Sequence, residues 1–419
     1  MTGSPVRPAD VSPRIGPRAA AVGIGYVLIY QTAVVAAVQT APVLAPFAAL
    51  GLGLDAKQIG LLTAVVFAAA LLSSTGTAGI VARVGSFPGA ALSLLAVAAG
   101  AATLAAAQGP AGLVAGAALI GIGYGPVNPI GSRVLSRVAA GPRRNLVFSF
   151  KQSSVAIGGA AAGLALPAVA LATDWRTAAL CAAGFALAMA ALAWPARAVL
   201  GADGDRGASM RLALPLAPVR RLLADPAQRG LAVGVFAFSM AQFGFMSVYV
   251  AMLWRQAELS PEGAAFMLSL AMIASVAGRL LWGWVADAGG RPRRVLAGLA
   301  WSGAATLLLM LTLSPAWPWA AVALASLALG FGPMGWSGVL LAEVARAGDA
   351  RDGLRGVLTA TSGSMVFAYL GGLVGPAALS VSALATGGYS VGILFLAAAF
   401  VVCALSVARD PLSEPETPR

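Results

Sequence analysis

Two positively charged side chains stand inside long apolar stretches of the sequence. Lys151 lies in LVFSFKQSSVAIGG, and Arg279 lies in VAGRLLWGWVAD, eight residues before Asp287. A charge placed in hydrocarbon costs roughly 2.5–3.5 kcal/mol on insertion scales and is usually retained for function. Ammonium and guanidinium groups offer a positive charge together with N–H donors, which is the chemistry that binds a carboxylate or another anion.

The acidic residues offer these two cations no obvious partner. No aspartate or glutamate lies near the middle of any apolar run. Because a buried unpaired charge is expensive, an anionic ligand that completes the pair explains both cations. The alternative is snorkelling, in which a long side chain reaches from near a helix end to the lipid headgroups. Snorkelling is the favoured interpretation for Arg133, which stands near the end of an apolar run.

Polar and aromatic residues of several apolar runs could complete a site for a small anion. Gln242 and Tyr249 are seven residues apart, which predicts that they share one face of a helix. Taken singly, such residues more often hydrogen-bond between helices than bind a ligand. The candidates that accompany Lys151 and Arg279 are Tyr30, Gln31, Tyr124, Asn128, Gln152, Ser153, Gln242 and Tyr249.

The composition indicates a membrane protein. Of 419 residues, 59% are hydrophobic and 10% are charged, whereas soluble domains carry about 25% charged residues. The net charge of +12 arises in the short connections between apolar runs, so it orients the chain in the membrane and does not indicate nucleic-acid binding. The sequence has no histidine and no recognisable nucleophile–base pair, metal cluster or phosphate-binding loop, so we expect neither an enzyme nor a metal or cofactor.

The hydropathy pattern predicts an all-α polytopic membrane protein with twelve transmembrane helices. Each apolar run is long enough to cross a bilayer core of about 30 Å. Pro42 and Pro46 are expected to tilt or kink the first run, which exceeds that length. The predicted spans are 19–50, 58–82, 88–107, 111–137, 145–172, 177–196, 228–256, 261–286, 294–313, 319–345, 354–384 and 388–408.

The basic residues concentrate in alternate connections, which predicts that both termini lie in the cytoplasm. One long hydrophilic segment divides the spans six and six, and GIGYGPVNP (121–129) corresponds to ALGFGPMGW (328–336). This repetition predicts two pseudo-symmetric six-helix bundles. The predicted parts are a tail at 1–18, an N-terminal bundle at 19–196, a cytoplasmic linker at 197–227, a C-terminal bundle at 228–408 and a tail at 409–419.

The loop GWVADAGGRPRR (283–294) resembles a signature of the major facilitator superfamily of secondary transporters, G-x-x-x-D-x-x-G-R. Gly283, Asp287, Gly290 and Arg291 match it. The N-terminal copy keeps Arg83 and Gly85, but Ala82 stands where the acid is expected. TDWR (173–176) is also similar to an element of this family. The resemblance covers about 19–408, and it implies alternating access between two bundles whose fifth and eighth helices face each other.

The physical chemistry of this loop predicts a conformational latch. An acid at the cytoplasmic end of a helix can pair with a basic loop residue or with the N-terminus of a neighbouring helix. A contact made in only one conformation holds that conformation closed. We expect the latch residues to be Gly283, Asp287, Gly290, Arg291, Arg83 and Gly85.

The sequence therefore predicts a secondary transporter for a small organic anion, with a carboxylate as the expected group. The alternative is an efflux transporter for neutral or cationic compounds, but the related drug–proton antiporters carry an arginine where this chain has Ala117. A proton could travel on the substrate itself, or the protein could be an exchanger. We expect a monomer that contacts membrane lipids. The use of 25 arginines against 2 lysines indicates a GC-rich bacterium and hence its inner membrane.

Overall fold

The computed structural model consists of helices joined by short connections, and it describes residues 16–52, 55–138, 144–205, 207 and 216–408. Eleven helical stretches are long and apolar enough to cross a membrane. The ninth predicted span, 294–313, is also present as helix α13 (Pro292–Met310). Its hydropathy is lower because Arg293 and Arg294 occupy its first turn. Each of the twelve predicted spans therefore corresponds to helix in the structure.

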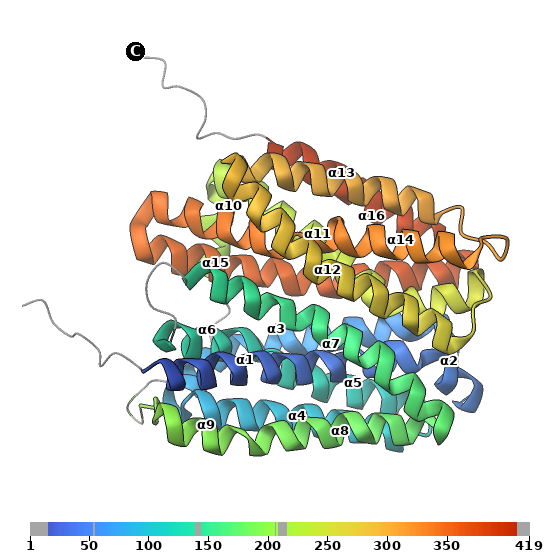
Figure 1. The fold of residues 1–419 in the computed structure, drawn as a ribbon, viewed down its shortest axis with the longest axis horizontal. Helices are drawn as coiled ribbons and strands as arrows, with labels where there is room; N and C mark the ends of the chain where they lie inside the picture. Colours follow the sequence, from blue (N-terminus) through green and yellow to red (C-terminus); the bar gives the residue numbers. More distant parts are fainter. Residues whose placement is uncertain (1–15, 53–54, 139–143, 206, 208–215, 409–419) are drawn as a thin grey trace, which may run out of the picture.

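The first span is broken, as its prolines predicted. Helix α1 (Pro17–Val38) ends one residue before Gln39, and α2 (Thr40–Leu52) follows. Pro42 stands four residues after Val38, so its ring removes the hydrogen bond that would have continued the helix through that carbonyl group. The break directs α2 onto a different path from α1 (Figure 1).

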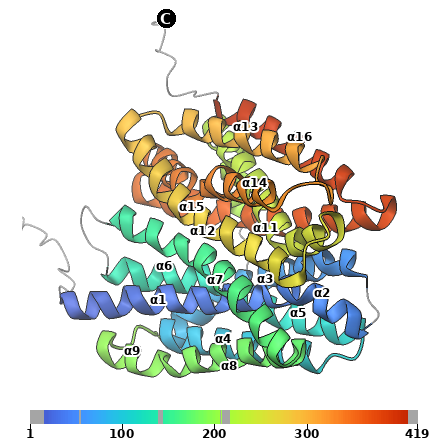
Figure 2. The same cartoon turned by 45° about the vertical axis from the view of Figure 1, so that its right-hand side comes forward.

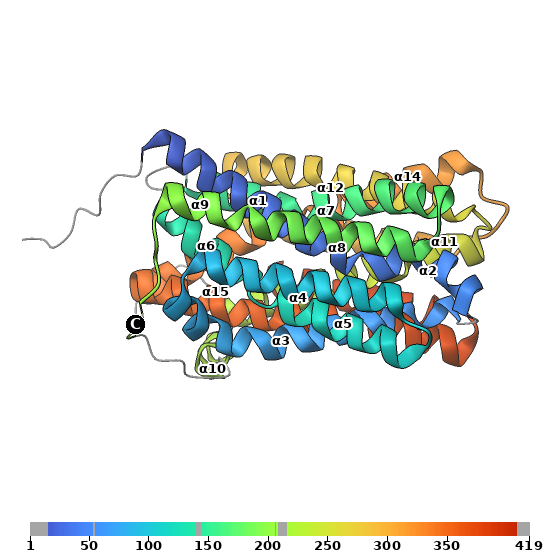
Figure 3. The same ribbon diagram turned by 90° about the horizontal axis from the view of Figure 1, so that it is seen from below.

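The helices α1 to α9 make up what we call the N-terminal half, drawn from blue to green in Figure 1. Helix α4 packs against both α5 and α8, as the view from below shows (Figure 3). The remaining elements of this half are η1 (Ala56–Gln58), α3 (Ile59–Val84), α4 (Ser86–Ala106), α5 (Pro110–Tyr124), α6 (Val127–Val138), α7 (Arg144–Ala172), α8 (Trp175–Ala191) and α9 (Ala193–Leu200).

The helices α10 to α16 make up the C-terminal half, which lies above the N-terminal half in Figures 1 and 2. Helix α10 falls inside the predicted linker, so part of that linker is helical. The elements are α10 (Leu216–Ala224), α11 (Pro226–Gln256), α12 (Pro261–Gly289), α13, α14 (Trp319–Phe331), η2 (Pro333–Gly335), α15 (Ser337–Thr386) and α16 (Ser390–Ala408). Helix α15 joins the last part of the tenth predicted span to the eleventh, with a kink between them at Asp352 and Gly353, where Gly353 has φ +52°.

The two halves break a helix at matching dipeptides. Helix α5 ends just before Gly125-Pro126, and α14 ends just before Gly332-Pro333. Proline cannot donate to the preceding turn, so each dipeptide separates an apolar helix from the segment that follows it. In the N-terminal half that segment is the short helix α6, which begins at Val127, after the break that ends α5.

The halves meet along three helix pairs. Helix α7 packs on α12, α3 on α15, and α2 on α11, so the fifth and eighth spans face each other as the family resemblance implied. We call the end that holds η1 the outer end, and the end that holds Arg83 and Asp287 the inner end, following the predicted topology. Near the outer end, the backbone N–H of Gly60 donates to the Ser380 hydroxyl at 2.9 Å.

Candidate functional site

Lys151 lies in α7 and points into the protein. Its side chain is buried, with 4% of the residue exposed, and its Nζ donates to Oδ1 of Asn128 in α6 at 2.9 Å. Gly131, one turn along α6, makes room for it, since a Cβ there would lie 2.9 Å from Cε of Lys151. The contact between Lys151 and Asn128 therefore depends on the position of α6, the short helix that follows the Gly125-Pro126 break.

Arg279 reaches the same place from the opposite half. It lies in α12, is 6% exposed, and its Nη1 donates to the backbone carbonyl of Gln152, the residue next to Lys151. Its Nε donates to the carbonyl of Met334 in η2 at 3.4 Å. Arg279 of the C-terminal half thus contacts the backbone of α7 one residue after Lys151, which belongs to the N-terminal half.

Neutral oxygens alone partner these two cations within the described residues. No carboxylate of that part of the chain lies within 4.0 Å of either side chain's nitrogen atoms, and the hydrogen-bond acceptors are an amide oxygen and two backbone carbonyls. Lysine has three N–H donors and arginine five, so most of the donor capacity remains for another group. The site can therefore accept a negative charge.

Several predicted residues join this cluster. The amide nitrogen of Asn128 donates to the hydroxyl of Tyr369 at 3.5 Å, and the ring of Tyr124 packs edge-on against that of Tyr369 at 6.0 Å between centroids. Gln152 contributes its carbonyl oxygen. Among side-chain atoms with no hydrogen-bond partner in the described structure are the Oε1 of Gln31 and the Oγ of Ser153, both buried. Such unpaired polar atoms are costly to bury.

Three predicted residues are not brought to the cluster. Tyr30 donates its hydroxyl to Ser93 at 2.8 Å in α4. Tyr249 shares a hydrogen bond of 2.7 Å with Ser326 in α14. These hydroxyls are satisfied inside their own halves, so we leave them out of the site. Gln242 also bonds within its own half, because its Oε1 accepts from the indole N–H of Trp336 at 2.7 Å.

Tyr369 is the residue that the sequence analysis missed. It lies in α15, is 4% exposed, and donates its hydroxyl to the carbonyl of Gly125 at 3.3 Å. It therefore joins the C-terminal half to the helix break that precedes α6. The signal that could have found it is its position, since it is the sole tyrosine of the predicted eleventh span.

The predicted latch residues lie at the inner end. Gly290 follows the end of α12 with φ +59°, and Gly85 separates α3 from α4 with φ +94°. Asp287, Arg291 and Arg83 are exposed, and none of them has a hydrogen bond or ion pair to another side chain within the residues that the structure describes. Gly283 has open space around the position of a Cβ. Within the described part of the chain, the predicted latch contacts are thus not formed.

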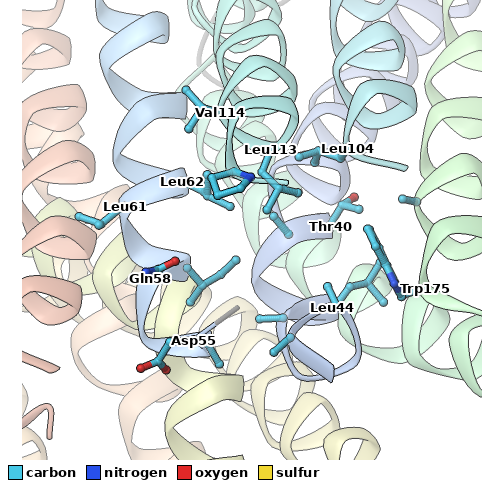
Figure 4. A pocket seen from close by; sticks show the side chains of 18 residues that line it. Thr40, Leu44, Asp55, Gln58, Leu61, Leu62, Leu104, Leu113, Val114 and Trp175 are labelled. Atoms are coloured by element: carbon cyan, nitrogen blue, oxygen red, sulfur yellow. The ribbon is translucent and has the colours of Figure 1, made fainter. Parts of the chain in front are cut away.

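A separate apolar pocket of about 320 Å³ lies at the outer end of the N-terminal half (Figure 4). Leu44 of α2, Leu62 of α3 and Leu113 of α5 line it, with Trp175 at one side. Its one charged lining residue is Asp55, which would repel an anion. This pocket is therefore distinct from the cluster of cations and does not suit an anionic ligand.

A charged cluster buried between two halves of membrane-spanning helices is the arrangement found at substrate sites of secondary transporters. The chain belongs to the Major Facilitator Superfamily, whose sequence profile matches residues 22–376. The predicted fold class, an all-α polytopic membrane protein with the fold of this superfamily, is confirmed. The protein is a transporter of this family and not an enzyme.

Solved structures support the same fold. A POT family transporter in complex with 5-aminolevulinic acid matches with a TM-score of 0.75 and 14% identity, covering 94% of this chain and 96% of that one. A peptide transporter POT in complex with sulfate matches at 0.71 and 14%, covering 94% and 95%. A bacterial homolog of the human lysosomal transporter Spinster, inward-facing and unoccupied, matches at 0.64 and 15%, covering 94% of each chain. Among curated proteins, none matches the sequence.

Proposed function

We propose that this transporter moves a small organic anion by alternating access, and that Lys151 and Arg279 bind it. The observation that supports this proposal is the burial of two cations, one on α7 and one against the α7 backbone one residue later, with no carboxylate of the described residues within 4.0 Å of either. Each cation lost its hydration on burial, and an anion would restore favourable electrostatics for both. A carboxylate has two oxygens and can accept from both side chains at once.

The placement of the cations also suggests how binding would drive transport. Lys151 belongs to the N-terminal half and Arg279 to the C-terminal half, so a bound anion would contact both halves. A ligand shifts a conformational equilibrium only through its different affinities for the two states. An anion held by both cations would favour the state in which the halves close around it, and its release would allow the return.

The described conformation is best interpreted as inward-facing. Hydrogen bonds join the halves near the outer end, where Gly60 donates to Ser380 and the Gln39 side chain donates to the Met246 carbonyl, both at 2.9 Å. The ring of Phe67 packs against that of Phe243 at 4.4 Å between centroids. At the inner end, the exposed side chain of Asp287 has no such partner in the described residues. We infer that the outer gate is closed here.

A flux assay on purified protein in liposomes tests this proposal. Labelled small carboxylates, such as lactate, benzoate and succinate, are added outside vesicles preloaded with the same unlabelled acid. Counterflow of at least one carboxylate is expected, and counterflow of lipophilic cations is not. Accumulation that requires an inward proton gradient would show that proton movement is coupled to transport of the acid and would distinguish co-transport from exchange.

One observation favours the alternative function, efflux of neutral or cationic compounds. The apolar pocket beside Asp55 could hold an apolar body near a negative charge. It lies within one half and at the outer end, which is a poor position for alternating access. Transport of a lipophilic cation that survives loss of both Lys151 and Arg279 would favour this function over anion transport.

We further propose the organisation that the sequence predicted, with both termini cytoplasmic, bundles at 19–196 and 228–408, a linker at 197–227, and location as a monomer in a bacterial inner membrane. The asymmetric placement of arginines supports the orientation. A reporter protein that matures only in the cytoplasm, fused after Arg419, would be active in this orientation and silent in the reverse one.

Substituting Asp287→Asn will slow turnover more than it weakens substrate binding. The carboxylate has no partner among the residues that the structure describes, so the neutral amide should leave that state intact but weaken the latch of the opposite state. We expect turnover to fall about tenfold, corresponding to about 1.4 kcal/mol, with the substrate Kd changed less than threefold. Flux and binding titration measured on one preparation check this, and Asp349→Asn at the same end serves as control. A Kd change as large as the change in flux would contradict the latch role.

A further inference from the structure

The first residues of the linker dock on the inner end of the N-terminal half. The backbone N–H of Asp205 donates to the carbonyl of Ala82 at 2.8 Å, and Arg137 of α6 donates to the carbonyl of Leu200 at 2.7 Å. Gly204 lies so close to the loop between α3 and α4 that a Cβ would come within 2.8 Å of the Arg83 carbonyl oxygen. The segment 200–205 therefore follows the surface of this half at fixed contacts.

Asp203 is the centre of this contact. Its side chain is 7% exposed, and its carboxylate accepts from the backbone N–H of Ser86 at 2.8 Å, from the Ser86 hydroxyl, and from Nε of Arg133 at 3.1 Å. Arg137 adds an ion pair at 3.7 Å. Burial alone would raise the pKa of this carboxyl, but the Ser86 bonds and the Arg133 charge outweigh it and hold the pKa below its usual value. The carboxylate also caps the N-terminus of α4.

These contacts occur where the N-terminal loop lacks its own acid. Ala82 occupies the position that corresponds to Asp287 in the C-terminal half. Asp203, which is 121 residues after Ala82 in the sequence, places a carboxylate at the α3–α4 loop. It also gives Arg133 a defined partner, which corrects the interpretation of Arg133 as a snorkelling residue.

The contact is connected to the cluster of cations through α6. This helix is separated from α5 by the Gly125-Pro126 break, so its position depends on the groups that hold its two ends. Asn128 bonds to Lys151 at one end, and Arg133 and Arg137 bond to Asp203 at the other. A change in the linker that moves α6 would therefore move Asn128 relative to Lys151.

We propose that Asp203 is a positioning residue of the transport cycle, in which the linker supplies the carboxylate that the α3–α4 loop lacks and fixes α6. It also compensates arginines at the inner end, which must approach the basic inner end of the C-terminal half when the inner gate closes. Neutralising Asp203 leaves that approach opposed by like charges. This role goes beyond the proposed function and does not depend on which substrate is carried.

Hydrogen–deuterium exchange tests the docking without any substrate. In Asp203→Asn, the amides of peptides covering 82–89 and 201–205 should exchange about tenfold faster, because local opening no longer breaks charge-assisted bonds. Asp205→Asn is the matched control, since the Asp205 side chain accepts from Gly207 N–H within the linker itself. Exchange in Asp203→Asn equal to that of the wild type would overturn the proposal.

Transport measurements then separate positioning from a merely structural contact. Turnover of whichever substrate the wild type carries should fall about tenfold in Asp203→Asn and stay within twofold of the wild type in Asp205→Asn. Adding Ala82→Asp to Asp203→Asn should recover at least half of the lost rate by returning an acid to the loop. Melting temperature monitors folding, and if Asp203→Asn does not fold, Ser86→Ala removes one partner more gently. If Asp203→Asn and Ser86→Ala both show faster exchange but unchanged turnover, Asp203 is only a structural cap and the proposal is contradicted.

Discussion

Substituting Lys151→Met will abolish transport while leaving a folded protein in the membrane. Methionine matches the length of lysine and is at ease in an apolar site, so the helix packing around Gly131 is expected to persist. The lost interaction is a buried, charge-assisted contact with the substrate, and truncating one partner of such a pair costs about 2–5 kcal/mol. Transport should therefore fall by at least about thirtyfold.

The second lysine of the chain provides the control. Lys57 lies in η1 at the outer end, where it is partly exposed, and it takes no part in the cluster. Lys57→Met should transport within twofold of the wild type. The assay is counterflow in liposomes with matched amounts of protein, and the melting temperature reports folding. Wild-type flux in Lys151→Met would remove this cation from the site.

Substituting Arg279→Met will have an effect of similar size, and Arg279→Lys will recover only part of it. The guanidinium donates from two nitrogens to the carbonyls of Gln152 and Met334, which fixes its orientation. Lysine keeps the charge but lacks the planar fork, so it cannot hold both carbonyls and an anion in the same geometry. We expect a loss of about a hundredfold for methionine and about tenfold for lysine.

Arg255 is the matched control for this experiment. It lies near the outer end of α11 with its guanidinium over the ring of Trp254, 4.6 Å from the centroid, and it is exposed. Arg255→Met should change flux less than twofold. If both cations hold one anion, Lys151→Met and Arg279→Met combined should lose little more than either alone. Independent, multiplying losses would mean that the two cations do not act on the same ligand.

The features predicted from the sequence are those that depend on apolar length and on backbone chemistry. The spans follow from runs that can cross the bilayer, and the break at Gln39 follows from prolines in the first run that cannot continue a helix. The breaks at Gly125 and Gly332 interrupt two spans that were predicted to be continuous. The two cations stood out because charge is expensive in such runs. That Arg279 contacts α7 beside Lys151 required only that the fifth and eighth spans face each other.

What the sequence could not predict is which buried face of a helix meets which neighbour. Helix α11 is buried on almost all sides, so its periodicity does not separate the face toward α14, where Tyr249 bonds to Ser326, from the face toward the N-terminal half. Tyr30 is buried against Ser93 of α4, a contact that no local pattern of the sequence reports. Tyr369 and Asp203 act across 241 and 70 residues of sequence, and no local pattern reports contacts of that range.

The thermal stability of the purified protein with added ligands tests the central claim most directly. A ligand that binds only the native state stabilises it by about 2.7 kcal/mol at a hundred times its Kd, and this raises the melting temperature. We expect stabilisation by at least one small carboxylate, absent in Lys151→Met and in Arg279→Met but kept in Lys57→Met. Stabilisation by lipophilic cations and by no carboxylate or inorganic anion would contradict anion binding and favour the efflux function.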